Sequence, residues 1–258
     1  MASYSQEGRV ALVTAAGRGV GRGVSKSLAE VGAVVAVNDI EADYAKAVAT
    51  EIVAAGGKAI AAPFDVRDRE QVRRGVQEIE GQVGPIEILV NCAGGGVTVG
   101  GGMGRFKDAD PAIWRKWLDL DLCGSLNTLH TVLPGMVERG WGRVVQISSG
   151  AGSRGHTSGI ALYGAAKAGI EAALRHIAME EAKSGVTLNS VALGIVSNNA
   201  GREHITGGAG VGTLGGVPMG RMVEPSEIGA CAVWLTSDLA AAVTGQVIHV
   251  NCGSHQGR

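Results

Sequence analysis

The segment that decides the fold is RVALVTAAGRGVGRG, residues 9–23. Its first six residues are mostly apolar and β-branched, which is typical of a strand buried on both faces. A glycine-rich turn follows, and a helical pattern runs over about residues 19–31. Glycines allow close approach to a pyrophosphate, and a helix N-terminus offers free N–H groups. The segment therefore predicts a dinucleotide-binding turn, although Arg22 stands where the last glycine of GxGxxG would fall.

Short apolar runs alternate with longer alanine-rich stretches along the rest of the chain. Expected strands cover residues 9–14, 33–38, 58–64, 86–91, 143–148, 186–191 and 246–250. Expected helices cover residues 19–31, 42–55, 69–82, 111–139 and 160–183, and another begins near Pro225. Apolar strands separated by helices of this length indicate a parallel sheet with helices on both faces. We predict one α/β domain over residues 1–258, a doubly wound, Rossmann-like fold.

Two irregular glycine-containing segments, residues 94–110 and 195–219, interrupt this alternation. Loops longer than about 12–15 residues within a compact domain are usually functional or disordered. Both segments follow the carboxyl end of an expected strand, where open α/β sheets bind ligands. We expect the first segment to be a pocket wall and the second to be a flexible lid.

Composition excludes several classes of function. The formal net charge is −1 with no basic block, so the charge expected of a nucleic-acid or membrane partner is missing. The four cysteines and six histidines show no metal-ligand spacing, so no metal site is expected. No signal-peptide pattern and no apolar run of about 20 residues is present. We expect a soluble, cytoplasmic protein that acts on a small molecule.

Asp39 ends the second expected strand, 18 residues after Gly21. A carboxylate at this position can accept hydrogen bonds from both adenosine ribose hydroxyls and would repel a 2′-phosphate. Arg18 favours NADP instead, because its guanidinium could pair with that phosphate. The balance favours NAD over NADP.

Tyr163 and Lys167 are four residues apart on an expected helix and therefore face the same side. An ammonium at ~4 Å stabilises a phenolate by about 4 kcal/mol at an effective dielectric constant of 20. A phenol stabilised in this way can exchange a proton with a substrate. Alone, the pair is more often a packed ring and a solvated amine.

The chain resembles the short-chain dehydrogenase/reductase family over about residues 8–253. The family's TGxxxGxG falls on residues 14–21, its DV on residues 65–66, its NNAG on residues 91–94, its catalytic serine on Ser149 and its YxxxK on Tyr163 and Lys167. The resemblance implies hydride transfer between nicotinamide and a carbinol or carbonyl carbon. Tyr163 would exchange the proton, Ser149 would bond the substrate oxygen, and Lys167 would hold the nicotinamide ribose.

Together, these observations assign the site residues. The expected catalytic group is Asp121, Ser149, Tyr163 and Lys167. The expected cofactor contacts are Ala15, Gly17, Arg18, Gly19, Val20, Gly21, Asp39, Asp65, Val66, Asn91, Ala93, Gly94, Tyr163, Lys167, Gly194 and Val196. By the resemblance, Asp65 and Val66 hold the adenine and Val196 contacts the carboxamide.

Three positions depart from the family pattern. The first motif glycine is Ala15, the asparagine of the catalytic tetrad falls on Asp121, and the proline of the PG motif falls on Leu193. Ala15 is acceptable if its φ is negative. Asp121 could accept a hydrogen bond from the water that links the lysine to solvent, or it could pair with Lys167 directly. A direct pair would weaken the effect of Lys167 on Tyr163.

The preferred function is an NAD-dependent dehydrogenase of a small or cyclic secondary alcohol, or a reductase of its ketone. One alternative is a reductase of 3-oxoacyl groups on a carrier protein or coenzyme A. The family's carrier-docking arginines fall on Gly140 and Ser184, but Arg139 and Lys183 are adjacent to these positions. Another alternative is a catalytically weak NAD-binding scaffold. The resemblance also implies a homotetramer, formed through the helices at residues 111–139 and 160–183.

Two further observations concern the substrate. His156 lies between Ser149 and Tyr163 and could contact it, although a surface position is the simpler interpretation. Trp114 and Trp117 are three residues apart on an expected helix, which favours packing over a substrate platform.

Overall fold

The computed structural model describes residues 3–95, 105–157, 159–197 and 216–255. Its centre is a seven-stranded sheet with the order β3-β2-β1-β4-β5-β6-β7 and parallel pairing throughout. The strands are β1 (Val10–Val13), β2 (Val34–Val37), β3 (Lys58–Ala61), β4 (Ile86–Asn91), β5 (Gly142–Ser149), β6 (Val186–Leu193) and β7 (Val247–Val250). The helices are α1 (Gly19–Glu30), α2 (Ala42–Ala54), α3 (Arg69–Val83), α4 (Trp114–Leu118), α5 (Gly124–Arg139), α6 (Ala161–Glu180) and α8 (Pro225–Thr236). The predicted doubly wound α/β fold is confirmed.

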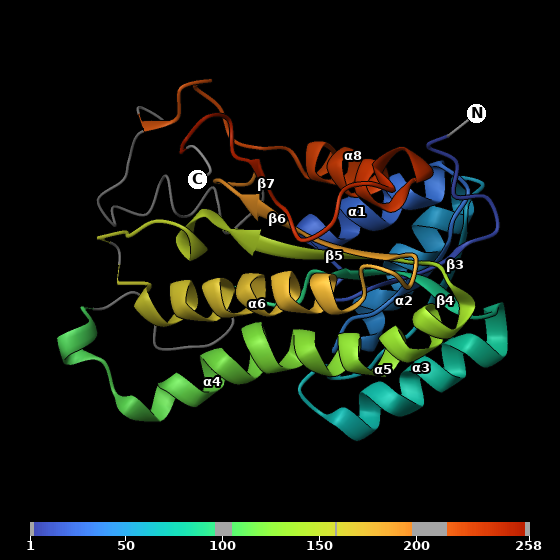
Figure 1. Cartoon of the computed structure of the whole chain (residues 1–258), viewed down its shortest axis with the longest axis horizontal. Coiled ribbons are helices and arrows are strands. Elements are labelled where there is room, and N and C mark those ends of the chain that lie inside the picture. The colour runs from blue at the N-terminus through green and yellow to red at the C-terminus, as the bar shows by residue number, and fades with distance from the viewer. Residues whose placement is uncertain (1–2, 96–104, 158, 198–215, 256–258) are drawn as a thin grey trace.

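Helices cover both faces of the sheet (Figure 1). One apolar core joins the sheet to α1, α2 and α8, and a second core joins it to α3, α5 and α6. Successive residues of β1 alternate between these cores: Val13 enters the first and Leu12 the second. Both sides of the strand are therefore apolar, which explains the continuous run VALV.

The region expected as one helix over residues 111–139 is divided in the structure. A short 3₁₀ turn, Pro111–Ile113, leads into α4, and a π-helical turn, Asp119–Cys123, separates α4 from α5. A π turn inserts one residue into the helical repeat, and such turns are frequent at functional sites. Asp121 lies within this turn and is fully buried.

Two strand boundaries differ from the prediction by more than one residue. β3 ends at Ala61, because the side chain of Asn38 then donates to the carbonyls of Ala62 (2.9 Å) and Phe64 (3.0 Å). β6 continues to Leu193, because its full length pairs with β5 as far as Ser149. This longer pairing brings the end of β6 level with the expected catalytic serine.

The sheet order reverses direction at β1 and β4, so the carboxyl ends of these strands form the switch point where such folds bind ligands. Most of the expected pocket wall and lid, residues 96–104 and 198–215, lies outside the described residues. Within the described ranges, no helix combines the length and apolar character needed to cross a membrane.

Candidate active site

The turn between β1 and α1 leaves the N-terminus of α1 uncapped. Arg18 occupies the N-cap position without a side-chain hydrogen bond, and no acidic residue lies in the first helical turn. The free N–H groups and the positive end of the helix dipole are therefore available to an anion. A Cβ at Gly21 would collide with the Ala15 carbonyl, so the helix lies directly on the turn. This turn and helix N-terminus together fit the pyrophosphate of a dinucleotide.

Ala15 adopts a left-handed conformation with φ of 47°, so the expectation of a negative φ is wrong. The cause lies in the neighbouring strands. Thr14 N–H donates to the Val90 carbonyl (3.0 Å) and Ala16 N–H donates to the Asn38 carbonyl (2.6 Å), which fixes the backbone on both sides of Ala15. A non-glycine residue in this conformation costs about 1–2 kcal/mol.

Asp39 lies directly beside this turn and is 4% exposed. Its carboxylate accepts the N–H groups of Gly17 and Glu41, both at 3.1 Å. A Cβ at Gly17 would lie 2.7 Å from Oδ2 of Asp39, so only glycine fits there. The exposed Arg18 guanidinium lies 5.0 Å from the centroid of the Tyr44 ring. The structure thus brings Asp39 and the glycine turn together and leaves Arg18 at the rim.

The expected adenine contacts lie after β3. Asp65 pairs with Arg67 at 2.7 Å, and the hydrogen bond from Arg67 lowers the pKa of the Asp65 carboxyl. Val66 is buried, and its carbonyl accepts from the Asn127 side chain at 3.0 Å. These contacts hold the end of β3 against α5.

The expected cofactor residues after β4 are held by contacts within the protein. The Asn91 amide donates to the Ser125 carbonyl (3.2 Å) and accepts from the Thr128 hydroxyl (2.7 Å). The Thr14 hydroxyl accepts the N–H of Ala93 at 3.1 Å, which joins the ends of β1 and β4.

The expected residues after β6 are likewise engaged. Gly194 N–H donates to the Val250 carbonyl at 3.1 Å. Val196 is buried and forms a bridge with Val223. These contacts fix the start of the segment that leads to residues 198–215.

Lys167 and Asp121 form a buried ion pair. Nζ lies 3.2 Å from Oδ1 of Asp121, and the side chains are 4% and 0% exposed. Nζ also donates to the Ile147 carbonyl at 3.2 Å, and Oδ1 accepts the Gly95 N–H at 3.1 Å. Of the two arrangements expected for Asp121, the structure therefore shows the direct pair.

Electrostatics in this pocket keep Lys167 charged. Burial, the largest single influence, disfavours the ammonium, but Asp121, Tyr163 and Cys92 together outweigh it, so the pKa of Lys167 is raised. Burial raises the pKa of the neighbouring Cys92 thiol to about 12, so this thiol stays protonated. Oδ2 of Asp121 is buried without a hydrogen-bond partner among the described residues.

Gly94 has a φ of 134° and lies against the ion pair. A Cβ there would collide with Asp121 and lie 2.8 Å from Nζ of Lys167. The glycine of the expected NNAG motif therefore gives the chain room to pass over both charged groups.

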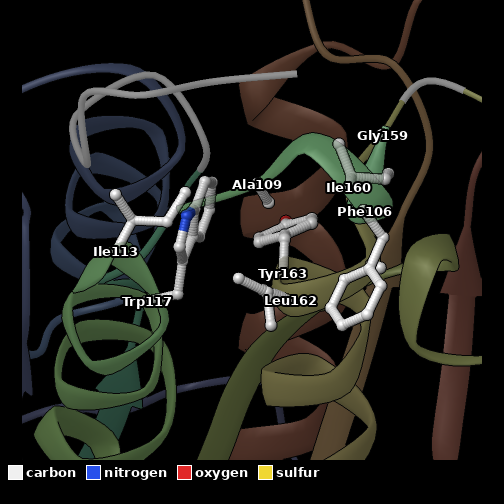
Figure 2. Close-up of a pocket in the computed structure, with 9 residues that line it drawn as sticks. Phe106, Ala109, Ile113, Trp117, Gly159, Ile160, Leu162 and Tyr163 are labelled. Carbon is white, nitrogen blue, oxygen red and sulfur yellow. The ribbon is translucent and has the colours of Figure 1, made fainter. Parts of the chain in front are cut away.

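Tyr163 borders an apolar pocket between α4 and the start of α6. Within the described chain, the pocket is lined by Phe106, Ala109, Ile113, Trp117, Gly159, Ile160, Ala161, Leu162 and Tyr163. In the view of Figure 2, Ile113 and Trp117 lie to the left of Tyr163, and Phe106 lies to its right. Trp117 is buried, and the centroids of its ring and the Tyr163 ring are 5.8 Å apart.

Aromatic residues are concentrated at this pocket. The chain has only four Trp, three Tyr and two Phe residues. Trp117 and Tyr163 meet inside the pocket, and Phe106 stacks on Trp114 at 5.5 Å beside it. Sequence analysis missed this cluster because Phe106 lies outside any expected helix or strand, so no periodic pattern relates it to Tyr163.

Ser149 is the last residue of β5, and its Oγ accepts the N–H of Ala151 at 3.2 Å. The hydroxyl proton therefore remains available to a substrate oxygen. A Cβ at Gly164 would lie 2.8 Å from the Ala151 carbonyl, so the turn after Ser149 packs on the helix that carries Tyr163 and Lys167. The four expected catalytic residues thus lie on three adjoining elements: the π turn, the end of β5 and α6.

Comparisons with known proteins identify the family of the chain. A family model described as enoyl-(acyl carrier protein) reductase matches residues 14–255. The 3-oxoacyl-(acyl-carrier-protein) reductase FabG of Vibrio harveyi is 34% identical over 249 residues, which cover 96% of this chain and 98% of that protein. The acetoacetyl-CoA reductase of Allochromatium vinosum is 37% identical and covers 95% and 98%.

Solved structures show the same fold. A 3-oxoacyl-(acyl-carrier protein) reductase from Brucella melitensis with bound NAD has a TM-score of 0.89 at 28% identity, over 98% of this chain and 94% of that chain. A gluconate 5-dehydrogenase from Burkholderia cenocepacia, in complex with NADP and tartrate, has a TM-score of 0.86 at 28% identity, over 97% and 96%. The chain belongs to the short-chain dehydrogenase/reductase family of NAD(P)-dependent oxidoreductases.

Proposed function

We propose that this protein transfers a hydride between NAD and a secondary alcohol or its ketone. The observation that carries the proposal is the buried Lys167–Asp121 pair beside Tyr163, on a helix that packs against the turn after Ser149. Bound NAD would supply the hydride acceptor. In the oxidation direction, Tyr163 as phenolate takes the hydroxyl proton, and Ser149 donates a hydrogen bond to the same oxygen. Lys167 favours the phenolate and holds the nicotinamide ribose.

The preference for NAD rests on Asp39. Its buried carboxylate accepts the Gly17 N–H of the glycine turn, where we expect the adenosine ribose, and the second negative charge of a 2′-phosphate would be repelled there. The structural neighbours include one protein with NAD and one with NADP, so the family alone does not decide the cofactor. Arg18 is exposed at the rim and lies over Tyr44, so it is less well placed than Asp39 to dominate the choice.

The apolar pocket favours a substrate with a cyclic, apolar body. Aromatic side chains pack well against flat rings, and Phe106 and Trp117 offer such surfaces next to Tyr163, while Ile113 adds an aliphatic one. A second candidate is reduction of a 3-oxoacyl thioester, which the activities of the Vibrio and Allochromatium relatives support.

Steady-state turnover of two probe pairs separates these candidates. Cyclohexanol and cyclohexanone test the cyclic substrate, and 3-hydroxybutyryl-CoA and acetoacetyl-CoA test the thioester, each with NAD(H) and NADP(H). We expect the highest kcat/KM for the cyclic pair with NAD(H). A preference for acetoacetyl-CoA would favour the second candidate. Binding of NADH without turnover of either probe would favour a scaffold.

We also infer a homotetramer in which α5 and α6 pack against their symmetry mates. α6 exposes Ala165 and leaves Met179 75% exposed, so an apolar surface remains beyond the face that covers the sheet. Light scattering at micromolar concentration tests this assembly, and a monomer would contradict it.

A further inference from the structure

We propose that His255, in the segment after β7, is a positioning residue for Ser149. The inference rests on the proposed function, because it assumes that Ser149 bonds the substrate oxygen. Gly150 follows Ser149 directly, and a Cβ on Gly150 would collide with the imidazole ring of His255. Residues 105 positions apart in the chain are therefore in direct contact beside the catalytic serine.

The hydrogen bonds around His255 determine its tautomer. Oδ1 of Asn251 accepts the N–H of Gly253 at 3.0 Å, which sets the orientation of the Asn251 amide. Its Nδ2 then lies 3.1 Å from Nδ1 of His255 and also donates to the His255 carbonyl at 2.7 Å. An amide NH₂ group only donates, so Nδ1 accepts and the ring proton lies on Nε2.

The Nε2 proton connects His255 to the turn after Ser149. Nε2 lies 3.3 Å from Oγ of Ser153, and that hydroxyl donates to the Gly150 carbonyl at 3.3 Å. The Ser149 hydroxyl accepts the Ala151 N–H within the same turn. The chain of hydrogen bonds thus runs from Asn251 through His255 and Ser153 to the turn that orients Ser149.

The turn is held from two sides. On one side, Gly164 packs on the Ala151 carbonyl, next to Tyr163 on α6. On the other side lies His255, and the Arg154 guanidinium donates to the Ser254 carbonyl at 2.8 Å. Ser149 and Tyr163 must reach one substrate oxygen together, and a misplacement of about 1 Å can cost on the order of 100-fold in rate. His255 therefore helps to set the distance between the two catalytic groups.

Protonation of His255 would break this network, because Nδ1 would then present a proton to the donating amide of Asn251. The titratable or charged groups that face the ring within the described chain are His249 on β7, whose ring centroid is 4.6 Å away, and Arg154 and His156 before α6. Burial and these neighbours lower the pKa of His255. The ring is neutral near pH 7, and turnover should fall as the pH drops through this pKa.

A double-mutant cycle tests the proposal, with the faster of the two probe pairs as substrate. His255→Phe keeps a ring against Gly150 but removes both hydrogen bonds. We expect kcat to fall about tenfold or more, with the KM for NAD and the melting temperature nearly unchanged, and His255→Gln to recover part of the loss. In a Ser149→Ala background, His255→Phe should have no further effect on kcat, because the route through Ser149 is already removed. Ser153→Ala breaks the network at its other end and should reproduce the loss.

Two results would overturn the proposal: an unchanged kcat in both His255→Phe and Ser153→Ala, or losses that multiply in the Ser149→Ala background. Imidazole ¹⁵N NMR at pH 7 provides an independent check. It should show His255 as the neutral Nε2–H tautomer, and an Nδ1–H tautomer or a charged ring would refute the network. Failure of the proposed function is distinguishable, because turnover would then survive Tyr163→Phe and Ser149→Ala.

Discussion

Two of the three departures from the family pattern, Ala15 and Asp121, lie in regions that respond to them differently. The cofactor region comprises residues 14–21 and Asp39. Its departure, Ala15, affects the backbone: Ala15 has a φ of 47°, because hydrogen bonds to the neighbouring strands fix the residues on both sides of it. In the catalytic region, Asp121, Ser149, Tyr163 and Lys167, the departure at Asp121 adds a buried charge paired with Lys167. Backbone geometry dominates the first region and charge dominates the second. We therefore expect the Ala15 departure to affect stability and the Asp121 departure to affect chemistry.

The largest effect should come from removing the proton-transfer group of the catalytic region. Tyr163→Phe keeps the ring against Trp117 but deletes the hydroxyl, so the fold is preserved. General acid–base groups contribute typically 10²–10⁴-fold, and we expect kcat to fall by that factor. NADH affinity, measured by fluorescence titration, should stay within a few fold. Activity within tenfold of the unmodified protein would refute the assignment.

In the cofactor region, Asp39→Asn removes the charge but retains an oxygen that can accept the Gly17 N–H. We expect NAD to bind about 10–100-fold more weakly, since a hydrogen bond to a charged group contributes roughly 1.5–3 kcal/mol. NADP should bind more tightly, because repulsion of the 2′-phosphate disappears. Asp39→Ala is the comparison variant, because it also removes the acceptor that holds the turn and should lower the melting temperature further. Unmodified protein with a higher kcat/KM for NADP would overturn the cofactor proposal.

The sequence predicted the fold well where one physical pattern dominated. β4 was predicted over residues 86–91 as observed, because four of its six residues are large and apolar, with Ile86 and Leu89 in one core and Ile88 and Val90 in the other. The π turn at Asp119–Cys123 was missed, because the local sequence DLDLC is equally compatible with a continuous α-helix. The sign of φ at Ala15 depends on hydrogen bonds to β2 and β4, which no local pattern reports.

For the site, the motifs predicted residues that the structure brings together, but not the contacts that hold them in place. Spacing on a helix predicted that Tyr163 and Lys167 share a face, and the Lys167 ammonium lies 5.7 Å from the Tyr163 ring centroid. The contact between His255 and the turn after Ser149 joins segments about 100 residues apart, so only the tertiary structure reveals it. Side-chain periodicity indicates which residues share a face of one helix or strand, but it says little about which loops contact each other.

A sharper test of the catalytic region is the pH dependence of alcohol oxidation by the Asp121→Asn variant. The negative charge of Asp121 offsets part of the electrostatic stabilisation that Lys167 gives to the phenolate of Tyr163. Removing this negative charge should therefore favour the phenolate. We expect the rising limb of alcohol oxidation to move by about 1 unit toward lower pH, a change of roughly 1.4 kcal/mol. The measurement is kcat/KM from pH 6 to 10. Asparagine retains an oxygen that can accept from Lys167 and Gly95.

Stability against pH serves as the control for this shift. Because the pKa of Lys167 is raised above its ordinary value of 10.5, the stabilisation from the ion pair is fully present below 10.5. It is lost only as the pH rises through the still higher folded value. Melting temperatures between pH 6 and 9 should therefore show no titration of Lys167. A lower melting temperature with an unmoved rate profile would mean that Asp121 acts only in packing.

The smallest expected effect is a stability gain from Ala15→Gly in the cofactor region. Glycine removes the strain of the left-handed conformation, about 1–2 kcal/mol, but it also loses a partly buried methyl and gains freedom in the unfolded chain. These terms oppose each other, so we expect a net gain of about 0.5–1 kcal/mol, a rise of roughly 1–4 °C in melting temperature. NAD affinity should change less than twofold, because the backbone path is already that of a glycine turn.

Ala16→Gly is the matched control. Ala16 is fully buried and is not among the described residues with positive φ, so this substitution relieves no backbone strain and should lower the melting temperature. If Ala15→Gly destabilises the protein as much as Ala16→Gly does, the methyl packing outweighs the strain and the contrast between the two regions fails at this position.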